Sequence, residues 1–301
     1  MTAIIEQPDT GGSTAGLTLA DVLTLERIGP MALQAPVWGR PGPPRVYGGQ
    51  LVAQALAAAV AASPGLSIRS LHGRFLAAGD TTRPLNYLTE SRTEAGDAYV
   101  VTARQGDAEV FHLLASFAEP SDDEAISPGD GASPPGVPNA APVVAPQATD
   151  DPWIRALEEA FPLDIRFVGL PPRTAIARGD RPEPYVATWL RSHDPLPPDP
   201  QIHAAALAYM SDLFLLSSAL LPHGCWVGDP GLSIASLDHA MWFHRQARAD
   251  DWVFYERRAV WAGGGRAVAR GTITDTAGNV LVTVMQEGLI RRRAPTSGVH
   301  A

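Results

Sequence analysis

Apolar residues recur at helical spacing in two long stretches of the chain. Pro64 and Gly65 end the first, GGQLVAQALAAAVAAS, at residues 48–63. Its apolar stripe consists of Leu51, Val52, Ala55, Leu56, Ala59 and Val60. The second, QIHAAALAYMSDLFLLSSALL at residues 201–221, is apolar on almost every side, which is typical of a buried helix. The pattern therefore predicts one core helix in each half of the chain.

Each predicted helix is followed by nearly the same seven residues. GLSIRSL stands at residues 65–71, and GLSIASL stands at residues 231–237 after a connection rich in Pro and Gly. Both run into strand-like segments, which are YVVTARQ and EVFHLLASF in the first half and DWVFYERRAVWA, RAVARGTITD and NVLVTVMQEGLI in the second. The shared order of elements indicates a duplication. We predict an α+β fold of two tandem units, each an antiparallel sheet wrapped around a central helix.

The halves are separated by SPGDGASPPGVPNAAPVVAPQATDD, which is rich in Pro, Ala and Gly and has no apolar period. We interpret this stretch as a linker. The predicted organisation is a flexible tail at 1–17, a first unit at 18–126, the linker at 127–151, a second unit at 152–293 and a C-terminal tail at 294–301.

Composition narrows the class of protein. Of the 301 residues, 45% are hydrophobic and 18% are charged, which is typical of globular domains with substantial cores. The net charge is −9 and all 23 basic residues are arginine, so nucleic acid is not an expected partner. No apolar run reaches the ~18 uncharged residues of a membrane span, and acidic residues stand near the start. With Cys225 as the only cysteine, we expect a cytoplasmic protein without a membrane span or an internal disulfide.

Three polar residues of the second half interrupt faces that should be buried. Asp212 lies on the apolar stripe of the second predicted helix, and Ser236 and Gln286 each share a strand face with apolar residues. These neighbours are Leu232 and Ile234 for Ser236, and Val280, Val282 and Val284 for Gln286. Taken singly, each has a structural explanation, because buried polar side chains are usually just hydrogen-bonded. Together, a carboxylate, a hydroxyl and an amide on one layer can hold a water molecule and raise its nucleophilicity.

The first half lacks this combination. Ser70 stands where Ser236 stands in the second heptapeptide, but the first predicted helix has no acidic residue. We therefore expect one working site per chain. His72 follows the first heptapeptide directly and is a candidate ligand contact, with a structural histidine as the alternative.

The chain resembles the type II acyl-CoA thioesterases, which have a double hotdog fold. The resemblance runs through LTLERIG, RVYGGQLVAQAL, SLHGRFLAAGD and LASFAEP in the first half, and through YMSDLFLL, LPHG, IASLDHAMWFHR and VMQEGLIR in the second. In that family an Asp, a Ser or Thr and a Gln orient the hydrolytic water. By motif they fall on Asp212, Ser236 and Gln286.

The resemblance implies hydrolysis of a fatty acyl-CoA to free acid and CoA. Asp212 is then the general base or the group that orients the water, with Ser236 and Gln286 fixing the water. Backbone N–H groups of Gly48 and Gly49, at the predicted start of the first helix, are candidates for polarising the substrate carbonyl, and His72 for contacting substrate. We expect no cofactor and no metal, and a homo-oligomer.

Two other functions fit the same fold. A hotdog enoyl-CoA hydratase is one, because GDTTRPLNYL at 79–88 is similar to a stretch of those enzymes, although Asn86 stands where their catalytic histidine would be. A non-catalytic acyl-CoA-binding protein is the other. It would need no water-activating residues, so a turnover assay discriminates.

Overall fold

The computed structural model describes residues 17–37, 45–120, 151–229 and 231–292. Within them, 13 strands form one antiparallel sheet. The first half contains α1 (Leu19–Leu23), β1 (Glu26–Gly29), β2 (Ala32–Ala35), α2 (Gly48–Ala62), β3 (Ser67–Phe75), β4 (Leu85–Ser91), β5 (Ala98–Gln105) and β6 (Ala108–Ala118). The second contains α3 (Pro152–Ala160), β7 (Leu163–Phe167), α4 (Pro172–Ala177), β8 (Tyr185–Ser192), α5 (Pro200–Ser211), the 3₁₀ helices η1 (Leu216–Ala219) and η2 (Leu221–His223), β9 (Leu232–Ser236), β10 (Asp238–Phe243), β11 (Val253–Gly263), β12 (Arg266–Thr274) and β13 (Val280–Arg292).

The strand order shows the duplication directly. It reads β1-β2-β4-β5-β6-β3 through the first half and continues β10-β13-β12-β11-β8-β7 through the second. The second half thus repeats the first in reverse, with β7, β8, β11, β12, β13 and β10 in the places of β1, β2, β4, β5, β6 and β3. The two halves join where β3 pairs with β10, with His72 opposite Ala240.

The two heptapeptides lie in equivalent strands. GLSIRSL leads into β3, and GLSIASL leads into β9, from which only Leu237 separates β10. Both β9 and β10 pair with β13, so they form one interrupted strand in the place of β3. The repeated sequence therefore marks a repeated structural element.

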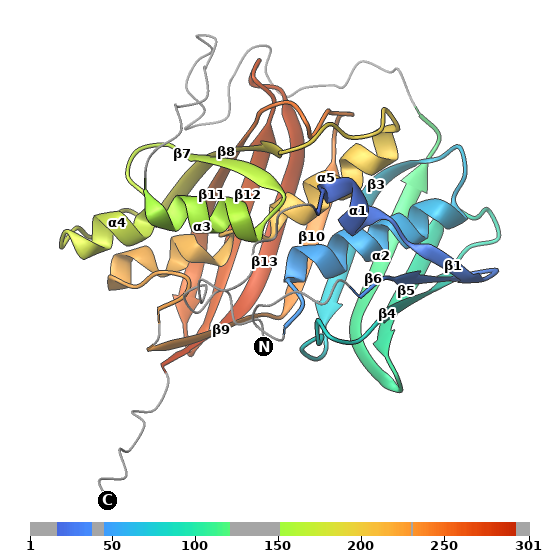
Figure 1. Ribbon diagram of the computed structural model, residues 1–301, viewed down its shortest axis with the longest axis horizontal. Coiled ribbons are helices and arrows are strands. Elements are labelled where there is room, and N and C mark those ends of the chain that lie inside the picture. Colours follow the sequence, from blue (N-terminus) through green and yellow to red (C-terminus); the bar gives the residue numbers. More distant parts are fainter. Residues whose placement is uncertain (1–16, 38–44, 121–150, 230, 293–301) are drawn as a thin grey trace, which may run out of the picture.

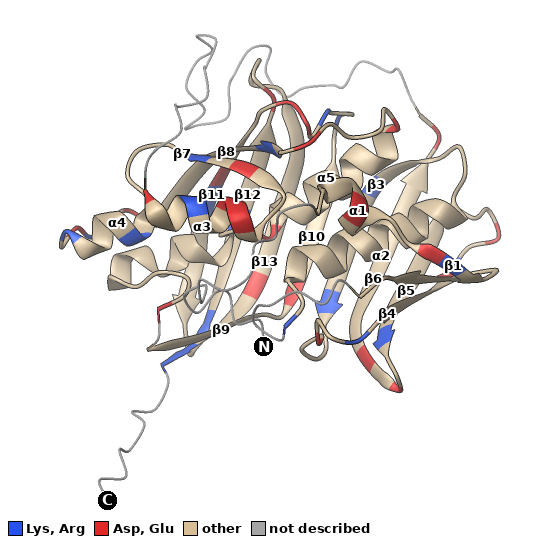
Figure 2. Ribbon diagram, in the orientation of Figure 1, with Lys and Arg blue, Asp and Glu red and all other residues tan. Residues whose placement is uncertain are grey.

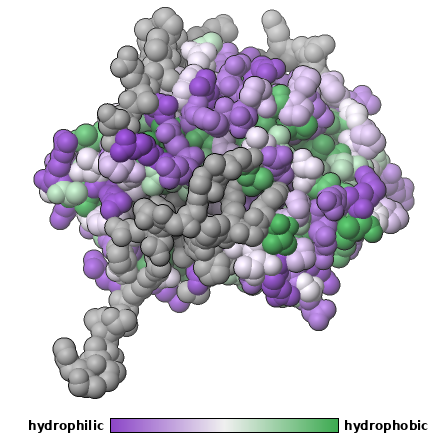
Figure 3. Space-filling view, in the orientation of Figure 1, coloured by the Kyte–Doolittle hydropathy of each residue, from purple (hydrophilic) through white to green (hydrophobic). Residues whose placement is uncertain are grey.

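Helices α2 and α5 form the centre of the core. Neither contains a Lys, Arg, Asp or Glu residue (Figure 2). They lie in front of the central strands in Figure 1, and most of their residues are buried. Described residues on the viewed surface of the molecule are mostly hydrophilic, with small hydrophobic groups between them (Figure 3). Burial of these two apolar helices helps to hold each sheet around its helix.

The second core helix is shorter than the apolar pattern predicts. We expected one helix over 201–221, but α5 ends at Ser211 and Asp212 forms its C-cap. Phe214 has a φ of 58°, in the left-handed region that non-glycine residues seldom adopt, and η1 and η2 follow. Apolar periodicity did not reveal the break because the residues on both sides of it are buried.

The broken helical segment Pro200–His223 is long and apolar enough, by length and composition, to cross a membrane, although Asp212 interrupts its uncharged run. Its most apolar window is 94% buried inside the structure, as in the core helix of a globular protein.

The predicted linker at 127–151 and the tails at 1–17 and 294–301 lie outside the described residues, apart from Leu17 and Asp151. Asp151 caps α3 by accepting a hydrogen bond from the N–H of Trp153.

Candidate active site

Asp212, Ser236 and Gln286 meet in the core of the second half. The Gln286 Nε2 group donates to Asp212 Oδ1 at 2.6 Å, and the Ser236 hydroxyl lies 3.4 Å from the same oxygen. All three are buried, and Asp212 is only 3% exposed. Because a carboxylate can only accept, the Gln286 amide must present its NH₂ to Asp212. The structure thus brings together the three residues that interrupt apolar faces.

Strand register explains how the two strand residues reach the carboxylate. Ser236 ends β9 opposite Gly288 of β13, and Gln286 lies two residues before Gly288, so both point to the same face. Val282 and Val284 are buried on that face, as the alternation of β13 predicts. A Cβ on Gly288 would collide with the side chain of Leu216 in η1. Glycine there lets the broken helix pack directly on the strand beside the site.

The N-terminus of α2 closes the site from the other half of the chain. A Cβ on Gly48 would lie 2.6 Å from Asp212 Oδ2. A Cβ on Gly49 would lie 2.5 Å from the Tyr47 ring and would collide with the carbonyl oxygen of Tyr209. The two glycines therefore allow α2, which begins at Gly48 as predicted, to start against the end of α5. Their role in binding substrate stays a prediction.

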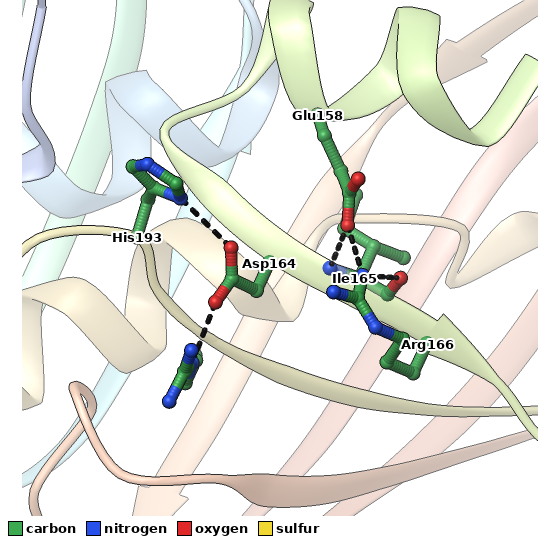
Figure 4. Close-up of polar contacts among 6 residues, drawn as sticks. Glu158, Asp164, Ile165, Arg166 and His193 are labelled. Atoms are coloured by element: carbon green, nitrogen blue, oxygen red, sulfur yellow. Dashed lines mark hydrogen bonds and ion pairs between the residues drawn. The ribbon is translucent and has the colours of Figure 1, made fainter. Parts of the chain in front are cut away.

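Burial sets the charge state of Asp212. Desolvation raises the pKa of its carboxyl, against the lowering effects of Gln286, the Gly49 N–H and Ser236. Asp164 shows the opposite balance (Figure 4). Burial raises its pKa, but the hydrogen bonds from His193 and Arg191 lower the pKa by more than burial raises it, so the net pKa is below the ordinary value. Among the described residues, no cation shifts the pKa of Asp212 in this way. A carboxylate held by neutral donors in a buried site is a stronger base than one in an ion pair.

Two acceptor atoms of the cluster are unused. Asp212 Oδ2 and Gln286 Oε1 are buried and have no hydrogen-bond partner within the described part of the chain. A water molecule has two protons, so one molecule can donate to both oxygens and keep a lone pair for attack. The described residues contain no group of three His, Cys, Asp or Glu side chains placed to hold a metal ion.

His72 does not join the cluster. It is exposed on β3, where its ring lies edge-on to Trp242 with the centroids 5.3 Å apart. Its neighbours Leu71 and Gly73 are buried and point to the core side of β3. A substrate contact by His72 therefore stays a prediction without a link to Asp212.

Sequence reasoning missed two tyrosines that hold the end of α5. The Tyr47 hydroxyl donates to the carbonyl of Tyr209 at 3.0 Å, and the Tyr255 hydroxyl donates to the carbonyl of Ser211 at 2.5 Å. Both hydroxyls donate to carbonyl oxygens that the break after Ser211 leaves without a helical N–H. The position of Tyr47 directly before Gly48 was the available signal.

Comparison with known proteins agrees with this fold and these motifs. The family model described as acyl-CoA thioesterase matches residues 157–289, and the one described as acyl-CoA thioesterase N-terminal domain matches residues 34–118. Acyl-coenzyme A thioesterase 8 of Homo sapiens is 32% identical over 97% of this chain and 94% of its own length. Acyl-CoA thioesterase 2 of Haemophilus influenzae is 32% identical over 82% of this chain and 88% of its own.

A solved structure supports the same assignment. The crystal structure of an acyl-CoA thioesterase II from Mycobacterium marinum superposes with a TM-score of 0.70 at 32% identity, over 92% of this chain and 98% of that one. The predicted double hotdog fold is confirmed by this likeness and by the reversed repeat of strands. The chain belongs to the acyl-CoA thioesterase family, hydrolases that act on the thioester bond.

Proposed function

We propose that the protein hydrolyses fatty acyl-CoA to free fatty acid and CoA, with Asp212 as general base and Ser236 and Gln286 as the residues that fix the water. The observation that carries this proposal is the buried Asp212 carboxylate, which Gln286 and Ser236 contact through one oxygen while the other stays open. We also propose that the protein is cytoplasmic and forms a homo-oligomer.

The reaction follows from the open acceptors. Water donates one hydrogen bond to Asp212 Oδ2 and one to Gln286 Oε1. Its oxygen attacks the thioester carbonyl carbon as Asp212 takes the proton of the first hydrogen bond, and the second proton stays on the attacking oxygen. Negative charge then develops on the carbonyl oxygen, where the N–H group of Gly48 at the start of α2 can donate to it, while the Gly49 N–H acts on Asp212. Collapse of the tetrahedral intermediate breaks the carbon–sulfur bond, and the proton held by Asp212 passes to the departing thiolate of CoA.

Release of free thiol from acyl-CoAs of increasing chain length tests this function. We expect steady turnover of long-chain acyl-CoA. Hydration of enoyl-CoA without thiol release would favour the hydratase, and tight binding of acyl-CoA without thiol release would favour the non-catalytic binding protein. Neither alternative is the function for which the relatives are named.

The pH dependence of turnover should report the raised pKa of Asp212. Below that pKa the carboxyl is protonated and cannot accept a proton from water, so kcat/KM should fall as pH decreases through it. The apparent pKa of the acid limb in the pH profile of kcat/KM is expected to lie above 3.8, the ordinary aspartate value. Measurement of kcat/KM against pH, with circular dichroism recorded at each pH to exclude unfolding, checks this. A limb at or below 3.8 would remove Asp212 as the base.

Ser236→Thr should be a mild change. Threonine keeps the hydroxyl that lies 3.4 Å from Asp212, and its added methyl suits a strand. We expect kcat to fall by less than about tenfold, against a larger loss for Ser236→Ala, which removes the donor. Steady-state assays of the two variants check the order. Equal activity of Ser236→Ala and the unmutated protein would show that this hydroxyl takes no part.

A further inference from the structure

His239 is a histidine that lies entirely inside the second hotdog unit. It belongs to β10, which stands between β3 and β13 at the middle of the sheet (Figure 1). Its side chain has 0% exposure. Because Ala240 pairs with Met285, His239 and Gln286 occupy neighbouring positions across the two strands, and both side chains are buried. His239 therefore lies beside the candidate active site.

The imidazole of His239 contacts the residue that directly precedes Asp212. Its Nε2 lies 2.7 Å from the hydroxyl oxygen of Ser211. That hydroxyl also faces the carbonyl of Ala208 at 2.8 Å and the sulfur of Met241 at 3.3 Å, both of which only accept. A hydroxyl has one proton, and with that proton given to one of these acceptors the Ser211 oxygen accepts from His239. The proton of the neutral imidazole is thus assigned to Nε2.

Contacts from two strands hold Ser211 in place. His239 of β10 donates to its hydroxyl, and Tyr255 of β11 donates to its carbonyl at 2.5 Å. The next residue is Asp212, the C-cap at which α5 ends. Because the carbonyls of the last helical turn lack intrahelical N–H partners, these contacts from the sheet fix the end of the helix. They thereby set where the Asp212 carboxylate lies relative to Gln286 on β13.

His239 provides this contact without a charge. Burial lowers the pKa of its ring to about 3, whereas burial raises the pKa of Asp212 above 3.8, so the ring is neutral wherever the carboxyl is ionised. A cation at this position would attract the carboxylate and weaken it as a base.

The imidazole is costly to bury at this position. Its Nδ1 atom is buried and has no hydrogen-bond partner within the described part of the chain. A buried polar atom without a partner destabilises the fold, and an apolar side chain would fill the same space without that cost. The contact with Ser211 is what the imidazole provides in return.

We propose that His239 is a positioning residue for the hydrolysis, which acts through the Ser211 hydroxyl to hold Asp212 where it can activate water. This deepens the proposed function and rests on it. The imidazole touches neither the water nor the substrate. Loss of its bond to Ser211 lets the end of α5 move, so kcat falls. KM changes little, because no group that binds the substrate is removed.

His239→Phe tests the proposal, because it keeps a planar ring and removes the donor. With the acyl-CoA that the unmutated protein hydrolyses fastest, we expect kcat to fall about tenfold or more and KM to change less than about twofold. His239→Gln places an amide N–H near the position of Nε2 and should restore most of kcat. Ser211→Ala removes the same bond from its other side. The double variant Ser211→Ala/His239→Phe should lose no more than the worse single variant, because both changes remove one contact.

His203→Phe is the matched control. His203 is a second buried histidine of this half, 3% exposed, whose Nδ1 accepts from the N–H of Ala249 at 3.0 Å. It lies near the start of α5, at the opposite end from Asp212. Its replacement should lower the melting temperature and leave kcat unchanged. The same result for His239→Phe would show that His239 serves the fold alone and would overturn the proposal.

Losses of kcat that add in the double variant, or normal kcat in a folded Ser211→Ala protein, would also overturn it. If His239→Phe does not fold, Ser211→Ala and His239→Gln decide. Failure of the catalytic proposal is read separately from Asp212→Asn, which keeps the bond between Ser211 and His239. Full turnover by that variant would remove Asp212 as the base. With turnover by Asp212→Asn lowered, adding His239→Phe to it should cause no further loss, and a further tenfold loss would show that His239 does not act through Asp212.

Discussion

Asp212→Asn is expected to lower kcat for a long-chain acyl-CoA by about 10²-fold or more while the fold is retained. The amide has the shape of the carboxylate, and its oxygen still accepts the bond that Gln286 Nε2 donates at 2.6 Å. It cannot take a proton from water. Steady-state release of free thiol, measured on both proteins at the same pH, gives the ratio. A folded Asp212→Asn protein with near-normal turnover would contradict the mechanism.

The same variant should gain stability near neutral pH. A carboxyl whose pKa is raised on folding destabilises the folded state once it is ionised, and this effect disappears as pH falls through the raised pKa toward 3.8. Asp212→Asn should therefore melt higher than the unmutated protein at pH 7, with the difference closing in acid. A lower melting temperature at pH 7 would mean that the charge itself is needed for folding.

Asp164→Asn is the matched control. Hydrogen bonds from His193 and Arg191 help to lower the pKa of Asp164 below its ordinary value. Its ionised form therefore stabilises the folded protein above that value, and this stability is lost as pH falls through the lowered pKa. Removing its charge should lower the melting temperature at pH 7 and leave kcat unchanged. The two substitutions thus move the melting temperature in opposite directions, and only Asp212→Asn lowers kcat, which a general effect of losing a carboxylate cannot do.

The local sequence pattern predicted the strand residues of the site because successive side chains of a strand alternate between its two faces. Ser236 and Gln286 were assigned to an apolar face by parity alone, and both are buried beside Asp212. The repeated heptapeptide predicted the duplication for a similar reason, since equivalent strands keep equivalent sequences. These inferences needed only neighbours within a few residues.

Contacts between the halves were beyond this kind of reasoning. Tyr47 and Tyr209 are 162 residues apart in sequence, and the approach of Gly48 to Asp212 depends on how two helices meet. The break at Phe214 was hidden because buried residues stand on both sides of it. In β11, Glu256 and Arg257 are both buried on opposite faces, so parity could not show that Arg257 points inward. Such features depend on tertiary packing rather than on the spacing of apolar residues along the sequence.

Gly49→Ala is expected to destabilise the protein by about 3 kcal/mol and to lower kcat roughly 10²-fold. In an unconstrained helix the change would be favourable, because alanine is the better helix former. Here the new Cβ would lie 2.5 Å from the Tyr47 ring and would collide with the backbone carbonyl of Tyr209, which cannot turn aside as a flexible side chain can. The start of α2 must therefore move away from the end of α5 and so from Asp212. Denaturant unfolding and steady-state hydrolysis measure the two effects.

Gly65→Ala separates this contact from the general cost of replacing a glycine. Gly65 has a φ of +81° and nothing within 4 Å of the added Cβ, so its substitution should cost about 1–2 kcal/mol from backbone strain alone and leave kcat unchanged. If Gly49→Ala lost no more stability than Gly65→Ala and kept full turnover, the two helix ends would not need to touch for catalysis. Loss of both properties only at Gly49 would instead show that the first half, which carries no acid of its own in α2, contributes to the site through the backbone of its helix.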